Sequence, residues 1–425
     1  MTETRSRRPL WRIVFRLDTI MVMVATVVVI WLAYIIPQNF DFLNPVGQAL
    51  GDIDLTDMVF SQFRNDESNV VDTSIVLVNI GTGSRSDIAD ILERVNEAQP
   101  LAVGLDVFFR TNKDSATDVR LANALATTTN LVMVSKVAYK NSNGDETNRP
   151  LTYNEAFDTL ETSLPMFCSN ARTGFANLVI DQEAAFMTCR EATLQEQCAN
   201  TVEPSFSLAL ADIVAPEAAL YARQRSNELE TINYHGNYGS FYHVDFEQIM
   251  DPSVSLDFMR GKTVLIGYMG SQFDDATLED KFFTPMNDHY VGRAFPDMFG
   301  VVVHANVLSM ITRRQYINTM PFWMSILVGA IVLVFNVSLF TWLYERYESW
   351  YDVLVVVIQL TQSIGMLFLI VIVFERLHYK LALTPALFGV FLVGTVHDLY
   401  QDSLKKIILS LISRWQQRSK SASSH

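Results

Sequence analysis

The sequence is poor in charge, and the charge it carries is unevenly distributed. Charged residues make up 18% of the 425 residues and hydrophobic residues 49%, which indicates that part of the chain is not soluble. Residues 39–320 hold 38 acidic and 19 basic side chains, whereas the rest of the chain is net basic. Because phosphate binding needs a basic patch and this middle segment has none, nucleic acid is excluded as a partner.

The chain also lacks the spacings that mark catalytic, nucleotide and metal sites. Gly81 and Gly83 follow a predicted strand, but the third glycine of a dinucleotide fingerprint and the lysine of a P-loop are missing. A tight turn before a helix capped by Ser84 or Ser86 explains these glycines. No cysteine pair with matching histidines and no nucleophile or paired-carboxylate constellation is recognisable. The sequence therefore predicts no enzymatic activity, no catalytic residue, no metal and no cofactor.

Residues 19–36 contain no charge at all and predict a first membrane-spanning helix. A helix of this length roughly matches the hydrocarbon core of a bilayer. A cleaved signal peptide is the alternative, but the apolar run is long and no A-x-A-like site follows it before Pro37. Residues 1–18 hold five arginines and acidic residues follow the helix, so we expect the N-terminus in the cytoplasm and residues 39–320 outside it.

Three further apolar runs, residues 322–343, 353–374 and 381–398, predict three C-terminal spanning helices. Four crossings return residues 399–425 to the cytoplasm, in agreement with the five lysines and arginines of this tail. The connector with Arg376 and Lys380 disagrees, because we expect it to face outward. Apolar residues at helical spacing in the tail predict an amphipathic helix on the inner membrane surface or on a partner protein.

A few polar side chains interrupt the predicted spans. Asn336, Gln359 and Gln362 are costly when they face lipid, so we expect them to form hydrogen bonds between helices. A transport pathway is the alternative, but the interiors of the three C-terminal spans hold no acidic or basic residue.

Residues 39–320 alternate between strand-like and helix-like patterns. Apolar runs at 74–80, 101–109, 131–137 and 262–269 predict buried strands, and apolar residues at helical spacing predict helices near 88–95, 119–126 and 301–315. This order predicts an α/β domain with a mixed, partly parallel sheet. Hairpins are predicted for 174–180 with 186–190 and for 231–234 with 241–244.

All three cysteines, Cys168, Cys189 and Cys198, fall in this predicted exported segment. An oxidising compartment allows one disulfide there. A short loop closes between Cys189 and Cys198, which makes them the preferred pair, although the sequence does not exclude the other two pairings.

Two positions combine a polar side chain with an apolar setting. Asp106 follows a predicted buried strand, at the sheet edge where ligands commonly bind, but a carboxylate satisfied by backbone donors also fits. His304 lies in the apolar segment VVVHAN, where it either binds a ligand together with Asn306 or is a half-buried histidine with satisfied hydrogen bonds.

Several segments together resemble a known family. SIVLVNI, LAVGLDVFF, GKTVLIGYMG, EDKFFTPMN and PDMFGVVVHANVLSMI are similar to the type 2 CHASE domain, the cyclase- and histidine-kinase-associated sensory extracellular domain, over most of residues 57–315. The resemblance implies an extracytoplasmic sensory role in a bacterial inner (cytoplasmic) membrane. Its motif positions, which are candidates for ligand binding or for folding, are Asp106, Asp280, Thr284, Pro285, His304 and Asn306.

The resemblance also implies an output, which we expect to lie in another protein. Only 26 residues follow Leu399, too few for a signalling domain of about 100 residues. We expect a receptor-like sensor that contacts membrane lipid, a small-molecule or protein ligand outside and a separate effector protein. A structural or scaffold subunit of an envelope complex is the alternative. The sequence leaves the ligand, the partner and the oligomeric state, including a homo-oligomer, open.

Overall fold

The chain forms two units, which the computed structural model describes over residues 14–39, 57, 60, 71–140, 146–147, 157–180, 188–273, 277–287, 295–407 and 410. The α/β unit is Gln48–Ile317, and the helical unit combines Met1–Gly47 with Asn318–His425. The α/β unit falls within the predicted exported segment, residues 39–320.

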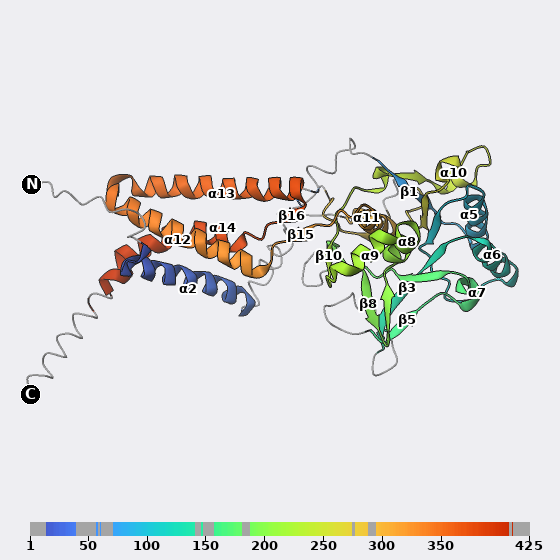
Figure 1. The fold of residues 1–425 in the computed structure, drawn as a ribbon, viewed down its shortest axis with the longest axis horizontal. Coiled ribbons are helices and arrows are strands. Elements are labelled where there is room, and N and C mark those ends of the chain that lie inside the picture. The colour runs from blue at the N-terminus through green and yellow to red at the C-terminus, as the bar shows by residue number, and fades with distance from the viewer. Residues whose placement is uncertain are drawn as a thin grey trace, which may run out of the picture. The chain divides into compact units, whose positions relative to one another are not determined.

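A largely parallel sheet forms the centre of the α/β unit (Figure 1). Strands β4 (Glu146–Thr147) and β5 (Thr159–Glu161) pair antiparallel with the second half of β3. The prediction of an α/β domain with a mixed, partly parallel sheet is therefore confirmed. The parallel strands are, in spatial order, β11 (Phe241–Val244), β1 (Asp72–Asn79), β12 (Thr263–Gly267), β2 (Ala102–Leu105), β3 (Leu131–Lys140) and β6 (Arg172–Phe175).

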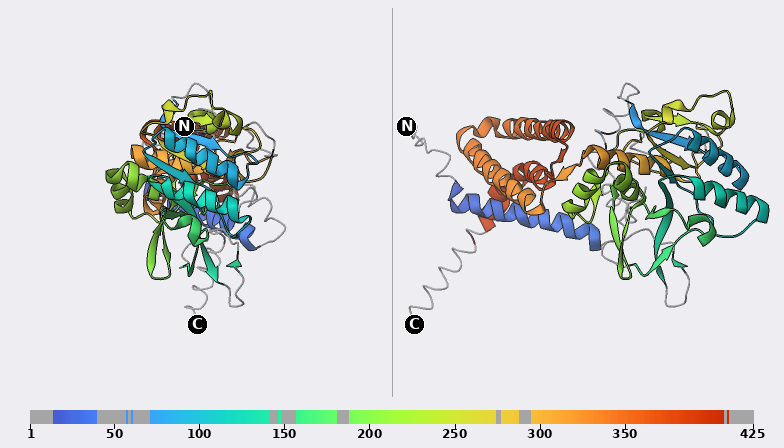
Figure 2. Two further views of the ribbon diagram at one scale, coloured as in Figure 1. Left: turned by 90° about the vertical axis from the view of Figure 1, so that its right-hand side faces the viewer. Right: turned by 45° about the vertical axis from the view of Figure 1, so that its right-hand side comes forward.

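Helices cover both faces of this sheet (Figure 2). Helices α5 (Arg85–Glu97), α6 (Ser115–Thr127) and α10 (Phe246–Met250) share one hydrophobic core with Val103 and Leu105 of β2. Gly104, between these two residues, faces α8 (Phe206–Val214), where an added Cβ would lie 2.8 Å from Phe206 Cζ. Helix α11 (Gly300–Arg313) packs beside α8 on this second face. The alternation of strand side chains thus produces a three-layer unit.

The turn after β1 has the predicted local chemistry. Gly81 has a φ of 52°, a left-handed conformation that glycine adopts without strain. Ser84 caps α5, because its side chain accepts a hydrogen bond from Asp87 N while the Asp87 side chain accepts one from Ser84 N. The capping prediction is confirmed at Ser84.

The predicted hairpin of 231–234 with 241–244 is wrong, and the predicted hairpin of 174–180 with 186–190 lies partly outside the described residues. Strand β6 pairs in parallel with β3, and β11 pairs in parallel with β1. A short alternating pattern indicates a half-buried strand, but it does not indicate which strand lies beside it. Strand β11 thus joins the central sheet instead of folding back locally, and its residue Val244 pairs with Val78, which lies 166 positions earlier in the chain.

The predicted disulfide between Cys189 and Cys198 is also wrong, because all three cysteines are free thiols. Cys189 is fixed by its backbone, whose N donates to Phe283 O and whose O accepts from Tyr234 Oη, both at 2.8 Å. Cys198 instead packs in a separate hydrophobic cluster with Phe157. Loop length alone suggested this pair, whereas both residues are free thiols in the folded chain. Burial raises the pKa of Cys189 to about 12, so its thiol stays protonated.

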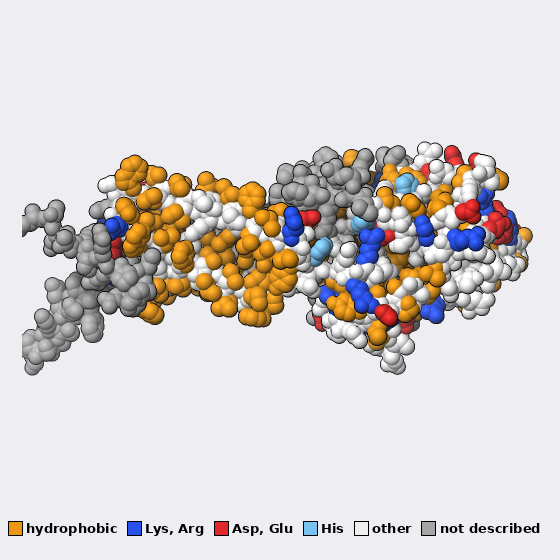
Figure 3. Space-filling model, turned by 45° about the horizontal axis from the view of Figure 1, so that its top comes forward, with side chains coloured by type: hydrophobic (Ala, Val, Ile, Leu, Met, Phe, Trp, Pro, Cys, Tyr) orange, Lys and Arg blue, Asp and Glu red, His pale blue; other side chains and the backbone are white. Residues whose placement is uncertain are grey.

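The helical unit contains α2 (Leu17–Asn39), α12 (Phe322–Arg346), α13 (Tyr351–Leu377) and α14 (Thr384–Leu399). Hydrophobic side chains cover its visible flank (Figure 3). Helices α12 and α13 are each long and apolar enough to cross a membrane. A two-residue parallel pair of strands, β15 (Asn318–Thr319) and β16 (Tyr379–Lys380), joins the segment before α12 to the connector between α13 and α14.

The prediction of four spanning helices is met clearly at two of the four positions within the described part of the chain. Helix α2 has 23 residues, of which Leu17–Leu32 is the described apolar part, and α14 has 16 residues. At about 1.5 Å per residue, 16 residues reach about 24 Å, which is shorter than a hydrocarbon core of about 30 Å. Pro385 at the start of α14 and the polar pair His397 and Asp398 at its end limit its apolar length.

The three polar residues singled out in the predicted spans differ in their contacts. Gln359 Nε2 donates to Val390 O at 2.7 Å and thereby joins α13 to α14. Asn336 Nδ2 donates to Val332 O of its own helix at 2.9 Å. Asn336 Oδ1 and Gln362 Oε1 are buried without a hydrogen-bond partner among the described residues.

Candidate ligand site at the carboxyl edge of the sheet

The segment that follows β12 leaves the sheet on the opposite face from the segments that follow its two neighbouring strands. The segments after β1, β2 and β11 lead to helices α5, α6 and α10 on one face, whereas the segment after β12 leads to α11 on the other face. Neighbouring parallel strands whose connections leave on opposite faces form a crevice at their carboxyl ends, the usual ligand position in open α/β sheets. The β1–β12 and β12–β2 boundaries are both of this kind.

Asn79, the last residue of β1, fixes the first boundary. Its Nδ2 donates to Asp245 Oδ1 at 2.8 Å and to Gly270 O at 3.1 Å. Its Oδ1 accepts from Gly81 N at 3.0 Å and from Met269 N at 2.9 Å. One fully buried amide therefore holds together the segments that leave β1, β11 and β12. Sequence analysis missed Asn79, although it ends a buried strand just as Asp106 follows one.

Asp106 and Asp280 meet at the second boundary. Asp106 N donates to Ile266 O at 2.8 Å, which sets the half-buried side chain beside the end of β12. Neither carboxylate has a hydrogen bond or ion pair with a described residue. Desolvation, with repulsion from Asp280, raises the pKa of Asp106 to about 7. The pKa of Asp280 rises to about 6, through desolvation and then repulsion from Glu279.

The N-terminus of α11 lies against Asp280. Gly300, the first residue of this helix, donates its N–H to Asp280 O at 3.0 Å. A Cβ on Gly300 would lie 3.3 Å and 3.4 Å from the two Asp280 carboxylate oxygens. Asp280 adopts a φ of 56°, which is uncommon for a residue with a side chain. The carboxylate is therefore held at the positive end of the helix dipole, where negative charge is favoured.

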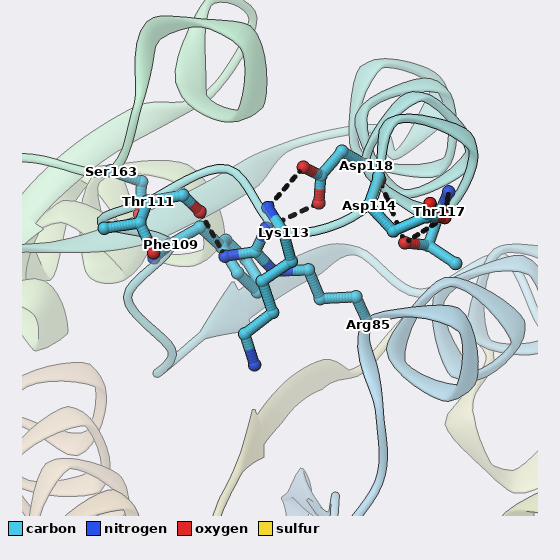
Figure 4. A network of polar contacts seen from close by, with 8 residues as sticks. All are labelled: Arg85, Phe109, Thr111, Lys113, Asp114, Thr117, Asp118 and Ser163. Atoms are coloured by element: carbon cyan, nitrogen blue, oxygen red, sulfur yellow. Dashed lines mark hydrogen bonds and ion pairs between the residues drawn. The ribbon is translucent and has the colours of Figure 1, made fainter.

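A buried ion pair holds the segment that follows Asp106 (Figure 4). Arg85 Nη1 lies 2.5 Å from Asp118 Oδ1, and Arg85 Nη2 donates to Thr111 O at 2.6 Å. Asp118 Oδ2 accepts from Lys113 N at 2.8 Å. Although desolvation opposes it, the hydrogen bond from Arg85 keeps the pKa of Asp118 below its usual value. This network, which sequence analysis also missed, ties the loop after β2 to the first turns of α5 and α6.

Thr284 and Pro285 belong to a separate turn that hydrogen bonds stabilise. Thr284 N and Oγ1 donate to the two carboxylate oxygens of Asp297, at 2.8 Å and 2.5 Å. Asn287 N donates to Thr284 O at 3.2 Å, which closes a turn with Pro285 at its second position. Desolvation raises the pKa of Asp297 to about 6 despite these donors. Both motif residues are buried, and their contacts close the loop between residues 284 and 297.

His304 and Asn306 fix α11 to its neighbours. His304 lies edge-on to Phe206 of α8 with ring centroids 5.4 Å apart, and burial lowers its pKa to about 4. Asn306 is fully buried, donates to Gly236 O at 2.9 Å and accepts from His235 N at 2.7 Å. Of the six predicted site residues, the structure thus brings Asp106 and Asp280 together at the carboxyl edge and places the other four in packing roles.

These features define a class of protein: an α/β unit with two carboxylates, Asp106 and Asp280, at the carboxyl edge of its sheet, linked to apolar helices. The model of the CHASE2 domain family matches residues 43–341, which is more than half of the chain. The chain belongs to the CHASE2 domain family, whose members are extracellular sensory domains. No curated protein and no solved structure matches the chain. Among the described residues, no group of three His, Cys, Asp or Glu side chains is arranged to hold a metal ion.

Proposed function

We propose that the chain is a membrane-anchored receptor whose α/β unit senses a ligand outside the cytoplasm of a bacterial cell. The family membership supports an extracellular sensory role. In the proposed topology α12 and α13 cross the inner membrane, and α2 and the 16-residue α14 are two further crossings, the short α14 being accommodated by local thinning of the bilayer. Both termini then lie in the cytoplasm, and the basic residues at both ends of the chain support this orientation. The proposal assigns no reaction to the chain.

The proposal rests on helix α11, which runs from one edge of the sheet to the other. Its first residue, Gly300, lies against Asp280 at the candidate site. Near its last turn, Ser309 Oγ donates to Asp72 Oδ2 at 2.7 Å and Arg313 Nη2 lies 2.9 Å from Asp72 Oδ1. One rigid helix of 14 residues therefore connects the carboxyl edge of the sheet with its amino edge.

The chain continues from α11 into the helical unit through a short, hydrogen-bonded segment. Asn318 N donates to His378 O at 3.0 Å, and Met320 N donates to Lys380 O at 2.9 Å. The segment before α12 is thus bonded to the connector between α13 and α14. A displacement of α11 along its axis acts through this segment on all three helices, which is the physical basis for transmission to a separate partner protein.

The test uses the full chain in lipid nanodiscs. We expect some member of a panel of small polar and cationic metabolites to raise the thermal unfolding temperature, because Asp106 and Asp280 offer unpaired acceptors. Asp106→Asn and Asp280→Asn are expected to abolish this rise, whereas Asp257→Asn, at a carboxylate that is 85% exposed, preserves it. Stabilisation that survives both crevice substitutions would contradict the assigned site, and the absence of any stabilising compound would contradict the sensory role.

A scaffold subunit of an envelope complex is the second candidate. Helix α13 supports it, because only 17% of its most apolar 18-residue window is buried within the chain and Gln362 Oε1 has no partner among the described residues. Lipid covers apolar side chains but does not satisfy a buried amide oxygen. Purification in mild detergent distinguishes the two functions: a stoichiometric partner that is lost with Gln362→Leu favours the scaffold, and a chain recovered alone opposes it.

A further inference from the structure

Segments from opposite ends of the chain contact each other where α2 begins. Lys405 Nζ lies 2.8 Å from Asp18 Oδ2, and Tyr400 Oη donates to Asp18 Oδ1 at 2.9 Å. Asp18 belongs to the first turn of α2, where a carboxylate also stabilises the helix dipole. A single carboxylate therefore holds two residues of the C-terminal segment.

Tyr400 and Lys405 reach the same carboxylate because the chain between them is not α-helical. Residues Tyr400–Leu404 form a π-helical turn, in which Lys405 N donates to Tyr400 O. In a regular α-helix, side chains five residues apart point about 140° apart around the axis. The wider π turn, with its i→i+5 hydrogen bond, brings them toward the same side. Such turns are rare and occur frequently at functional positions.

The two partners of Asp18 differ in how firmly they are held. Tyr400 is 4% exposed and packs in the hydrophobic core of the helical unit with Val22 and Val396. The side chains of Lys405 and Asp18 are 35% and 41% exposed, so their ion pair lies at the edge of that core. Arg16 forms a second ion pair at this end, with Glu345 of α12.

We propose that Asp18 is a latch: it holds the turn from Tyr400 to Lys405 against α2, and a displacement of α2 releases Lys405 together with the Lys406–Ile407 bond beside it. Moving the carboxylate removes one acceptor from both Tyr400 and Lys405, yet only Lys405 depends on it for its position because the Tyr400 ring is packed in the core. The latch goes beyond the sensory proposal. It can be tested without a ligand, so its failure leaves the sensory role unaffected.

The first experiment tests the contact. A zero-length carbodiimide activates a carboxylate and lets a touching amine displace the activating group, which forms an amide with net loss of water to the carbodiimide. In the full chain in nanodiscs, mass spectrometry is expected to find the amide between Asp18 and Lys405. Lys405→Arg, whose guanidinium keeps the charge but does not form this amide, is the control. The absence of the amide in the unmodified chain would overturn the contact.

The second experiment tests release by following trypsin cleavage after Lys406 in the same nanodiscs. Asp18→Asn is expected to raise the cleavage rate about fivefold, the size of effect that a partly exposed ion pair of this kind supports. The exchanged pair Asp18→Lys with Lys405→Asp is expected to bring the rate back toward that of the unmodified chain. Asp352→Asn, at an exposed carboxylate of α13, is the control and is expected to leave the rate unchanged. Equal rates for Asp18→Asn and the unmodified chain, or an equal rise with Asp352→Asn, would contradict the latch.

Discussion

Asn306 and Asp106 are both motif residues of the α/β unit, but their surroundings are opposite. The Asn306 amide is fully buried and has partners on both its nitrogen and its oxygen. The Asp106 carboxylate is half-buried, has no hydrogen bond or ion pair with a described residue, and has a pKa raised to about 7. A satisfied polar group stabilises a fold, whereas a desolvated and unpaired one destabilises it. The difference separates residues that the fold requires from residues that the fold merely tolerates.

The largest expected effect is at Asn306. Asn306→Ala removes the partner of His235 N, Gly236 N and Gly236 O in a buried setting. Each buried group left unpaired costs about 1–3 kcal/mol, so we expect the free energy of unfolding to fall by about 4 kcal/mol. Thermal unfolding of the full chain in detergent measures it. Asn123→Ala, at an exposed position of α6, is the matched control and is expected to change stability by less than about 0.5 kcal/mol. Similar losses for the two variants would contradict the statement that the hydrogen bonds of Asn306 stabilise the fold.

Asp106 is expected to respond in the opposite direction. Its pKa of about 7 in the folded chain lies above its ordinary value of 3.8, so the folded state holds a proton that the unfolded state releases. Stability is therefore greatest below pH 4 for this group and is lost as the pH rises through 7. Asp106→Asn is always neutral and avoids that loss. We expect equal stability of the two chains near pH 4 and an advantage of about 4 kcal/mol for the variant at pH 8, because each tenfold change in proton affinity is worth about 1.4 kcal/mol and the pKa rises from 3.8 to about 7.

The measurement for Asp106 is the unfolding free energy of both chains between pH 4 and 8. His304, with its pKa lowered to about 4, has the reverse dependence, since its contribution is lost as the pH falls below about 6.5. Its effect is common to both chains and cancels in their difference. Asp257→Asn, at an exposed carboxylate, is expected to give no difference. A difference that does not change with pH would contradict the raised pKa, and an advantage of the unmodified chain at high pH would show that the carboxylate is paired.

A smaller effect is expected at two glycines, one in a crowded position and one in an open position, where no polar group is involved. A Cβ on Gly174 of β6 would lie 2.7 Å from Phe206 Cα and 2.9 Å from Phe206 N, which are backbone atoms that cannot turn away. Gly174→Ala is expected to lower the free energy of unfolding by about 2 kcal/mol. Gly239→Ala adds the same methyl group where no atom lies within 4 Å and is expected to be nearly neutral. Chemical denaturation of the two variants tests the pair.

The smallest expected effect comes from comparing Gln359, which has a hydrogen-bond partner, with Gln362 in the helical unit. Gln359→Leu removes the hydrogen bond to Val390 O and is expected to lower stability by about 0.6 kcal/mol, the average for such bonds between membrane helices. Gln362→Leu removes an amide oxygen that has no partner among the described residues and is expected to be neutral or stabilising. Unfolding in mixed micelles compares them, and an equal loss for both would mean that Gln362 has a partner as good as that of Gln359.

Sequence reasoning recovered the parts of the molecule that follow from local pattern. The continuous apolar runs around Ile75, Val103, Val132 and Leu265 are parallel strands of one sheet, because a strand buried on both faces needs no polar alternation. Ser84 caps its helix as its position predicts. The family motif also located Asp106 and Asp280.

The errors concern contacts between distant segments. The sequence does not indicate that β11 lies beside β1, that Cys189 and Cys198 stay free thiols, or that Asn79 joins three loops. Such pairings depend on how whole elements pack, and many arrangements share one local pattern. The four-span prediction counted apolar residues, whereas α14 is limited by Pro385 and His397 at its two ends.

The account depends most on the α/β unit lying outside the cytoplasm while the C-terminal segment lies inside. Cysteine labelling with a membrane-impermeant maleimide tests it directly, in Cys168→Ser chains that carry either Ser255→Cys, in an exposed turn of the α/β unit, or Ile407→Cys, which is 54% exposed. The account predicts that, in cells with a permeabilised outer envelope, Ser255→Cys is labelled and Ile407→Cys is labelled only after lysis. Labelling of Ile407→Cys in intact cells, or protection of Ser255→Cys until lysis, would contradict it.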